Sequence, residues 1–351
     1  MKKRESNIIK IGNIYLGGGE SVKIQSMCTT KTSDVAATVS QIDRLYKAGC
    51  EIIRVSVLDE QDALAIKEIK ASSPIPLVAD IHFSHKLATM AIESGCDKVR
   101  INPGNIGGER EINIVAYCIK AHNIPVRVGA NTGSIEKTYL EKYGRSAKAL
   151  VESALYNASI LEKRGINDIV ISVKASDVPL TYEAYSLLAG KCDYPLHIGV
   201  TEAGTEAMAL AKSYSALGAL LLNGIGDTLR ISITGDPIRE VYAAKNLLRA
   251  IGLDKNYADV VSCPTCGRCM WNSIALAEKV GERVSNVKKP LKIAVMGCVV
   301  NGPGEAKDCD IGIAGSAEYC VIFKKGEIIK RVAARDAENE FFKVLDELID
   351  D

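Results

Sequence analysis

Short apolar runs alternate with longer amphipathic segments between residues 23 and 250, a pattern typical of parallel strands joined by helices. In the first predicted helix an apolar face extends from Val35 to Tyr46, Ser33 can cap the start, and Gly49 can end it. The predicted strands are Lys23–Met27, Ile52–Val57, Pro76–Asp80, Lys98–Asn102, Pro125–Gly129, Asp168–Val173, Pro195–Gly199 and an eighth within Ala219–Ile233. Eight such units predict a closed α/β barrel of the (β/α)8 TIM type, with an open doubly wound sheet as the alternative.

The pattern changes after Asp254. The remaining segment contains six of the eleven cysteines, and its apolar runs predict a small α+β domain. Its predicted elements are strands at Leu291–Val295 and Asp310–Ile313, a hairpin formed by Tyr319–Phe323 and Ile328–Val332, and a terminal helix at Glu338–Ile349. We therefore expect two domains, a TIM-type barrel over residues 1–254 and a second domain over residues 255–351.

Charge and hydropathy exclude several classes of function. The 351 residues include 44 Lys plus Arg and 43 Asp plus Glu, so no overall field exists to attract nucleic acid or an anionic membrane surface. No apolar run reaches the length of a signal peptide or of a membrane span. We expect a cytoplasmic protein that binds neither nucleic acid nor membrane.

Polar residues gather at the predicted carboxyl ends of the strands. All strands of a parallel barrel end at the same face, where the following loops form one site. The candidates for binding a substrate there are Arg54, Asp80, His82, Arg100, Asn102, Arg127, Asn131, Lys174, Arg230 and Ser232. Arginines inside apolar strands need partners, and a phosphate or diphosphate fits them best. The alternative is that each arginine pairs with a barrel carboxylate such as Asp80 or Asp227.

Glu202 is the candidate acid or base of this site. It follows the seventh predicted strand in Gly-Val-Thr-Glu-Ala-Gly, among small residues and close to the predicted cations. A carboxyl group placed there can exchange a proton with a bound ligand. It can equally act as a counter-charge in a phosphate site.

The eleven cysteines divide into two groups. Five are scattered singly and are expected to be buried in the core: Cys28, Cys50, Cys96, Cys118 and Cys192. The others include the run Cys263-Pro-Thr-Cys266-Gly-Arg-Cys269 and a distant Cys298, followed by Gly-Pro-Gly-Glu305. Such spacing favours a metal or an iron–sulfur cluster. Structural zinc with Cys269 or Cys309 as fourth ligand, or a redox pair of Cys263 and Cys266, are the alternatives.

These motifs together resemble one family. Ser-Cys263-Pro-Thr-Cys266-Gly-Arg and Gly-Cys298-Val-Val-Asn-Gly-Pro-Gly-Glu305-Ala resemble the bacterial 4-hydroxy-3-methylbut-2-en-1-yl diphosphate synthases of the methylerythritol phosphate route to isoprenoids. The resemblance continues through Gln25-Ser26-Met27, Arg-Ile-Asn-Pro-Gly-Asn-Ile-Gly and Gly-Ile-Gly-Asp-Thr-Leu-Arg-Ile-Ser. It therefore extends over nearly the whole chain.

The resemblance implies both an architecture and a cofactor. It implies a (β/α)8 barrel followed by a small domain resembling sulfite-reductase modules. It also implies a [4Fe–4S] cluster whose ligands, carried onto this sequence, are Cys263, Cys266, Cys298 and Glu305, with Cys269 outside the ligand set. Glu305 is an oxygen ligand, so we expect it to leave iron more readily than a thiolate would.

The resemblance also implies a reaction. The substrate is 2-C-methyl-D-erythritol 2,4-cyclodiphosphate, a cyclic diphosphate that is opened and dehydroxylated to the linear allylic diphosphate with two electrons delivered singly. Glu202 would protonate the departing hydroxyl. Reduced ferredoxin or flavodoxin would be the electron donor, in a homodimer in which the cluster domain of one subunit caps the barrel of the other.

Two functions of other classes remain as alternatives. One is a phosphate- or pterin-binding barrel transferase with a structural zinc site, and the other is a non-catalytic iron–sulfur scaffold. The scaffold explains poorly why so many polar groups stand at strand ends.

Overall fold

The computed structural model describes residues 2–299 and 302–350, so Val300 and Asn301 of the motif around Cys298 lie outside the described residues. The chain divides into two compact units, Met1–Leu253 and Asp254–Asp351. The division falls one residue before the expected boundary. Each unit has a sheet and a hydrophobic core of its own.

The first unit is built on an eight-stranded parallel sheet with the order β8-β7-β6-β5-β4-β3-β10-β9. The strands are β3 (Lys23–Met27), β4 (Ile52–Ser56), β5 (Leu77–Asp80), β6 (Lys98–Ile101), β7 (Val126–Asn131), β8 (Ile169–Lys174), β9 (His197–Ile198) and β10 (Thr228–Leu229). A parallel bridge between Ile171 and Leu196 joins the two edge strands and closes the sheet. The prediction of a TIM-type barrel is confirmed, and the open sheet is not.

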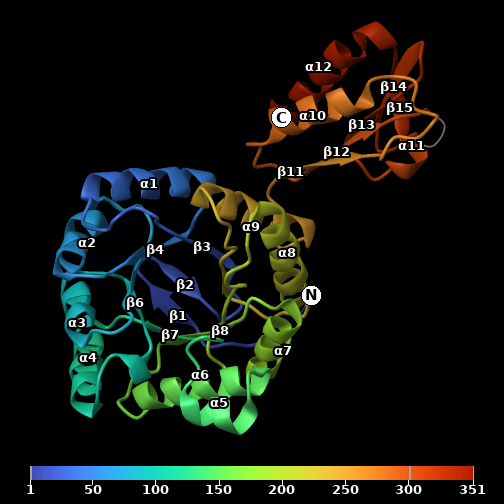
Figure 1. Ribbon diagram of the computed structural model, residues 1–351. Helices are drawn as coiled ribbons and strands as arrows, with labels where there is room; N and C mark the ends of the chain where they lie inside the picture. Colours follow the sequence, from blue (N-terminus) through green and yellow to red (C-terminus); the bar gives the residue numbers. More distant parts are fainter. Residues whose placement is uncertain (1, 300–301, 351) are drawn as a thin grey trace. The chain divides into compact units, whose positions relative to one another are not determined.

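Helices surround these strands (Figure 1). They are α1 (Val35–Ala48), α2 (Glu60–Ser72), α3 (His85–Glu93), α4 (Glu109–His122), α5 (Lys137–Tyr143), α6 (Ala147–Glu162), α7 (Val178–Ala189), α8 (Glu206–Leu222) and α9 (Pro237–Ala250), with a 3-10 turn η1 (Pro103–Asn105) after β6. The predicted cap of α1 was wrong by one residue. Asp34 accepts the hydrogen bond from the Ala37 amide, whereas the Ser33 amide is bound to Asp62. Gly49 ends α1 in the left-handed region, as predicted.

A short hairpin closes one end of the barrel and was not predicted. It consists of β1 (Ile9–Ile11) and β2 (Ile14–Leu16), paired antiparallel. Their apolar side chains pack against residues near the amino-terminal ends of the barrel strands: Ile52, Val78 and Val170. The amino-terminal end of the barrel is therefore filled, and the site can form only at the carboxyl ends of the strands.

The second unit has a five-stranded sheet in sequential order. Its strands are β11 (Ala258–Ser262), β12 (Leu291–Met296), β13 (Ile311–Gly315), β14 (Tyr319–Lys324) and β15 (Glu327–Ala333), of which the first three are parallel and the last two antiparallel. Helices α10 (Ser273–Val284) and α12 (Ala337–Asp350) share a hydrophobic core with this sheet, and α11 (Gly302–Glu305) is one short turn. Prediction found β12 to β15 and α12, but missed β11 and α10. The similarity to sulfite-reductase modules stays a prediction.

Four of the five scattered cysteines are buried, namely Cys28, Cys50, Cys96 and Cys118, while Cys192 is half-buried. Their placement agrees with a packing role. Among the helices that the structure describes, none is long and apolar enough to span a membrane.

Candidate functional site

A polar cavity of about 120 Å³ opens at the carboxyl ends of the barrel strands. It is lined by Arg54, Asp80, His82, Arg100, Arg127, Asn131, Ser172, Lys174, Val200, Thr201, Arg230 and Ser232. Nine of the ten predicted substrate-binding residues are in this lining. The exception, Asn102, is buried but absent from it. Ser172, Val200 and Thr201 were not predicted. Ser172 lies two residues before Lys174 on β8 and so points the same way, whereas Val200 and Thr201 follow β9.

Strand register brings these side chains together. Arg100 pairs with Asp80 across β5 and β6 and with Arg127 across β6 and β7, so three charged residues of neighbouring strands stand at one level. Two glycines make room for their neighbours. A Cβ atom on Gly129 would lie 2.6 Å from Ser172 Oγ, and one on Gly199 would lie 2.8 Å from Lys174 Nζ, so a side chain at either position would displace a lining residue.

Asp80 neutralises two of the arginines. Its carboxylate lies 3.5 Å from Arg54 Nε and 3.2 Å from Arg100 NH1. Burial raises the pKa of Asp80, but Arg54, Arg100 and Arg127 outweigh it and hold the pKa at about 2. The NH1 of Arg100 also donates to His82 Nε2 at 2.7 Å, so the imidazole is the acceptor. Burial, together with these arginines, lowers the pKa of His82, although Asp80 opposes the change.

Arg230 pairs with a carboxylate that the sequence did not point to. Its guanidinium donates to both oxygens of Glu240 on α9, at 3.0 and 3.1 Å. Glu240 is buried behind the lining and also accepts from the hydroxyl of Ser26 at 3.2 Å. Asp227, the other carboxylate considered for internal pairing, instead forms ion pairs with Lys3 and Arg4.

Two cations of the lining have no carboxylate among the residues that the structure describes. Arg127 is 2 % exposed, and its Nε and NH1 have no hydrogen-bond partner there. Lys174 forms no ion pair within residues 2–299 and 302–350. Burial lowers the pKa of Lys174 well below its ordinary value, and the nearby arginines lower it further. Five lining cations thus face the single carboxylate of Asp80, with Glu240 behind them.

Glu202 lies at the edge of this arrangement. The two preceding residues, Val200 and Thr201, line the cavity, but Glu202 itself is exposed and outside the lining. Its backbone has φ of 51°, in the left-handed region that residues other than glycine rarely adopt. Such strain at the edge of a cavity is common at functional sites. Its role as proton donor stays a prediction.

The buried cations predict how stability depends on pH. The pKa of Lys98 and of Lys174 is well below the ordinary 10.5, mainly because of burial. Between the lowered and the ordinary pKa, the unfolded chain binds more protons than the folded one, so stability rises with pH. We expect the urea midpoint of the ligand-free protein to rise with pH in this range, because the free energy of unfolding has a limiting slope of about 1.4 kcal/mol per pH unit for each such lysine. Lys174→Met should flatten this dependence, and a midpoint that falls over the same range would contradict it.

A second cavity, of about 180 Å³, lies in the unit Asp254–Asp351. Its lining contains all four predicted cluster ligands: Cys263, Cys266, Cys298 and Glu305. Cys266 is exposed, so the cavity opens to solvent. Within the described residues no three such side chains are close enough to hold a single metal ion. The ligands of a cluster with several irons stand farther apart, so a shared cavity is the relevant criterion.

The backbone around this cavity is adapted to sulfur. The Gly297 amide donates to Cys263 Sγ at 3.1 Å, an interaction that stabilises a thiolate. A Cβ atom on Gly297 would lie 3.0 Å from Cys269 Sγ and 3.2 Å from Cys263 Sγ, so only glycine leaves room for the two sulfurs. Three thiols, one carboxylate and this glycine fit an iron–sulfur cluster.

The other cysteines of the second unit are outside the lining. The Cys269 thiol lies 3.2 Å from the Trp271 carbonyl and 3.3 Å from the Ser273 hydroxyl. Cys309 and Cys320 are buried in hydrophobic clusters, and burial raises the pKa of both thiols. A closed zinc site with Cys269 or Cys309 as the fourth ligand is therefore not favoured.

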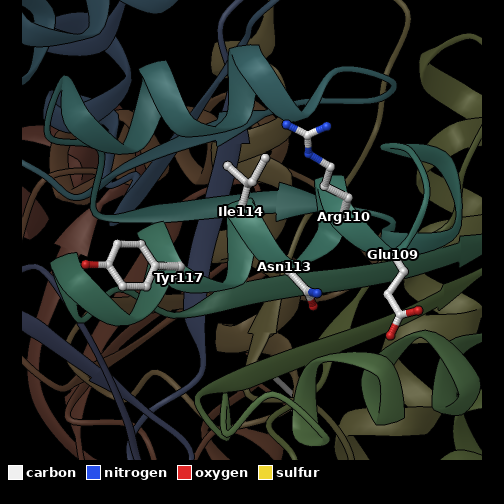
Figure 2. Close-up of a pocket in the computed structure, with 5 residues that line it drawn as sticks. All are labelled: Glu109, Arg110, Asn113, Ile114 and Tyr117. Carbon is white, nitrogen blue, oxygen red and sulfur yellow. The ribbon is translucent and has the colours of Figure 1, made fainter.

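A larger hollow of about 710 Å³ lies on the outer surface of α4. Figure 2 shows the residues that line it, Glu109, Arg110, Asn113, Ile114 and Tyr117, spread along the helix rather than converging on one point. Size alone would favour this hollow over the barrel mouth. The barrel cavity is the better candidate because buried or half-buried charged groups from six strands or their following loops converge there.

Comparison with known proteins agrees with both halves of the chain. The model of the GcpE TIM-barrel domain matches residues 6–245, and that of the GcpE protein C-terminal domain matches residues 259–347. Curated relatives named 4-hydroxy-3-methylbut-2-en-1-yl diphosphate synthase (flavodoxin) include one from Caldanaerobacter subterraneus, 55 % identical over 97 % of this chain and 96 % of the relative. Another, from Clostridium perfringens, is 50 % identical over 99 % of both chains.

Solved structures agree on the barrel. N-acetylneuraminic acid synthetase from Leptospira borgpetersenii, 14 % identical, covers 82 % of this chain and 100 % of that one with a TM-score of 0.51. Dihydropteroate synthase from Yersinia pestis, 10 % identical, covers 70 % and 97 % with a TM-score of 0.50. At this level of identity the likeness concerns the fold alone. The family matches and the curated relatives extend over both units, and the chain therefore belongs to the GcpE family.

Proposed function

We propose that this chain catalyses the reductive ring opening and dehydroxylation of 2-C-methyl-D-erythritol 2,4-cyclodiphosphate. The product is 4-hydroxy-3-methylbut-2-en-1-yl diphosphate, the compound in the names of its curated relatives, made in isoprenoid biosynthesis by the methylerythritol phosphate pathway. One observation carries the proposal. Five buried or half-buried cations line a cavity in which Asp80 is the single carboxylate among the residues that the structure describes, and a diphosphate supplies the missing negative charge.

The lining cations fall into two groups by how they can bind the ligand. Arg127 and Lys174, which have no carboxylate partner among the described residues, are free to bind phosphate oxygens directly. Arg54, Arg100 and Arg230 are already oriented by Asp80 and Glu240, and each retains donors for the ligand. Asn131, Ser172, Thr201 and Ser232 add uncharged donors at the same mouth. In this proposal Asp80 orients arginines rather than contacting phosphate.

The cavity of the second unit would hold a [4Fe–4S] cluster through Cys263, Cys266, Cys298 and Glu305. Such a cluster, when bound, supplies electrons one at a time, which suits reduction of an unreactive polyol. The Gly297 amide lowers the negative charge on Cys263 by its hydrogen bond. The exposed Glu305 is the ligand most easily displaced, because oxygen binds such iron less firmly than sulfur does.

Glu202 would donate the proton that lets a hydroxyl leave as water. Its position beside Val200 and Thr201 places its backbone at the rim of the mouth. A carboxyl group at that rim meets the end of the ligand that projects from the cation-lined cavity. The phosphates, held deeper, stay out of the proton transfer.

The electrons would come from reduced flavodoxin, the carrier in the relatives' printed name, with ferredoxin as a second possible donor. We further propose a homodimer in which the cluster domain of one subunit caps the barrel of the other. This assembly would bring the electron-donating group to the bound diphosphate, since neither site can complete the reaction alone.

The function is tested with anaerobically purified protein, reduced flavodoxin and the cyclodiphosphate. We expect the linear allylic diphosphate to accumulate with the consumption of two electrons for each molecule formed. A colourless protein that contains zinc without sulfide and leaves the cyclodiphosphate intact would instead favour a phosphate- or pterin-binding transferase.

A further inference from the structure

A second polar layer, which we call the lower layer, lies beneath the cavity and consists of Gln25, Lys98 and His197. Side chains alternate between the two faces of a strand, so residues two apart point the same way. The three residues precede, by two positions each, Met27, Arg100 and Gly199. Each of those faces the cavity or one of its cations. The lower layer therefore points into the barrel interior.

Contacts of Met27, Arg100 and Gly199 show that these three positions face the inside of the barrel. Arg100, two residues after Lys98 on β6, lines the cavity. The sulfur of Met27 lies 3.1 Å from Arg54 Nε. A Cβ atom on Gly199 would lie 2.8 Å from Lys174 Nζ. Met27, Arg100 and Gly199 are thus at the level of the cavity, one layer above the lower layer.

The lower layer is buried, and apart from a contact of 3.5 Å between His197 Nδ1 and Thr228 Oγ1 its polar groups lack hydrogen-bond partners in the part of the chain that the structure describes. Gln25 is 1 % exposed, and Lys98 and His197 are 0 % exposed. Within residues 2–299 and 302–350, Lys98 Nζ, His197 Nε2 and both amide atoms of Gln25 have no hydrogen-bond partner. Burying such groups is costly, and apolar side chains commonly fill this level of a TIM-type barrel. A structural purpose does not account for them.

The charged groups around Lys98 in the barrel are almost all cations. They are Arg54 on β4, Arg100 on β6, Arg127 on β7, Lys174 on β8 and Arg230 after β10, with the carboxylate of Asp80 on β5. Gln25 on β3 is uncharged, and burial lowers the pKa of the His197 imidazole on β9 well below its ordinary value. Asp80 already contacts two arginines. Burial, followed by Arg127 and Arg54, lowers the pKa of Lys98 well below its ordinary value. The ligand-free barrel thus disfavours the protonated form of this amine, which lies beneath the anion site.

We propose that Lys98 is a positioning residue of the anion site, which binds a proton from solvent when a multiply charged anion enters the cavity above it. The inference rests on the diphosphate-binding function proposed for that cavity. The anion supplies the negative charge that the lower layer lacks. The ammonium group of the protonated Lys98 then increases the affinity of the cavity for the anion. Two residues along a strand span about 7 Å, at which an added charge changes affinity by about ten- to thirtyfold.

Calorimetry tests this coupling. The cyclodiphosphate is titrated into the anaerobically purified full chain without reductant at pH 7.5, in buffers of different ionisation enthalpy, which counts the protons bound. Each phosphorus of this ligand has one ionisable hydroxyl, which stays ionised throughout the neutral range, so the protons counted are bound by the protein. We expect about one more proton to be taken up by the natural chain than by Lys98→Met.

Two further readouts separate positioning from a structural role. Lys98→Met should bind the cyclodiphosphate about ten- to thirtyfold more weakly, yet melt at a higher temperature without ligand, because an unpartnered buried amine has been removed. A residue that only supports the fold would lower both affinity and melting temperature. Gln25→Met is the matched control, since it removes polar atoms from the same layer without removing a charge and should leave the proton count unchanged.

The outcomes are distinguishable. A natural chain that does not bind the cyclodiphosphate overturns the proposed function. Binding with equal proton uptake in the natural chain and in Lys98→Met overturns the role of Lys98 and leaves the anion site standing. If Lys98→Met does not fold, the proton count of the natural chain is the test, because binding of the cyclodiphosphate without any proton uptake contradicts the proposal.

Discussion

Replacing Cys266 by serine is expected to remove nearly all iron and sulfide from the protein and, with them, its activity. Of the three thiols in the lining of the second cavity, that of Cys266 is exposed, whereas Cys263 and Cys298 are half-buried. The substitution replaces the Cys266 thiolate by a weaker oxygen ligand. We expect the loss to exceed the roughly ten- to hundredfold cost of removing an outer-sphere partner. Iron and sulfide analysis of the anaerobically purified variant, with its visible absorbance, measures it.

Cys269→Ser is the matched control. Cys269 belongs to the same run of cysteines, but its thiol contacts the Trp271 carbonyl and the Ser273 hydroxyl and is absent from the cavity lining. A serine hydroxyl can donate to the same carbonyl, so the variant should retain its iron. If Cys269→Ser loses iron and Cys266→Ser keeps it, the proposed ligand set is wrong.

Glu202→Gln is expected to lower kcat by about 10²- to 10⁴-fold while the cyclodiphosphate still binds, because the amide keeps the shape of the side chain but cannot give up a proton. The phosphate-binding cations are unchanged in this variant, so KM should change little. Steady-state kinetics with reduced flavodoxin, together with calorimetric binding in the absence of reductant, separate the two effects.

Glu206→Gln provides a control four residues away. Glu206 begins α8, is half-exposed and pairs with Arg239, outside the barrel cavity. Its loss should leave kcat within about twofold, as expected for a surface ion pair. Glu202→Gly adds a test of folding, since glycine adopts the left-handed backbone of this position without strain and should not lower the melting temperature. Full turnover by Glu202→Gln would exclude its role as proton donor.

Long, regular elements were predictable from the sequence because their periodicity is repeated many times. Strands β3 to β8 and helix α12 lie within a few residues of the predicted ranges. The hairpin of β1 and β2 was missed because each strand has only three residues, too few for an alternating pattern to stand out. The β11 strand was missed because only Val260 and Val261 of its five residues are large and apolar, too few for a pattern to stand out.

The candidate site was predictable wherever the alternation along a strand continued to its end. Arg54, Arg127 and Lys174 line the cavity for this reason. Asn102 does not, because β6 ends at Ile101 and the chain turns into η1. The partner of Arg230 could not be predicted, because Glu240 comes from a helix and reaches the barrel through packing that no local pattern records.

The β1–β2 hairpin makes the barrel a chamber with a single entrance. Substrate and product must use the same opening in opposite directions, so they cannot pass each other. Product must leave before the next substrate enters, and the cluster domain that we propose as a cover of the mouth would have to withdraw once in every catalytic cycle. A molecule that holds this cover in place would stop turnover without occupying any of the phosphate-binding residues.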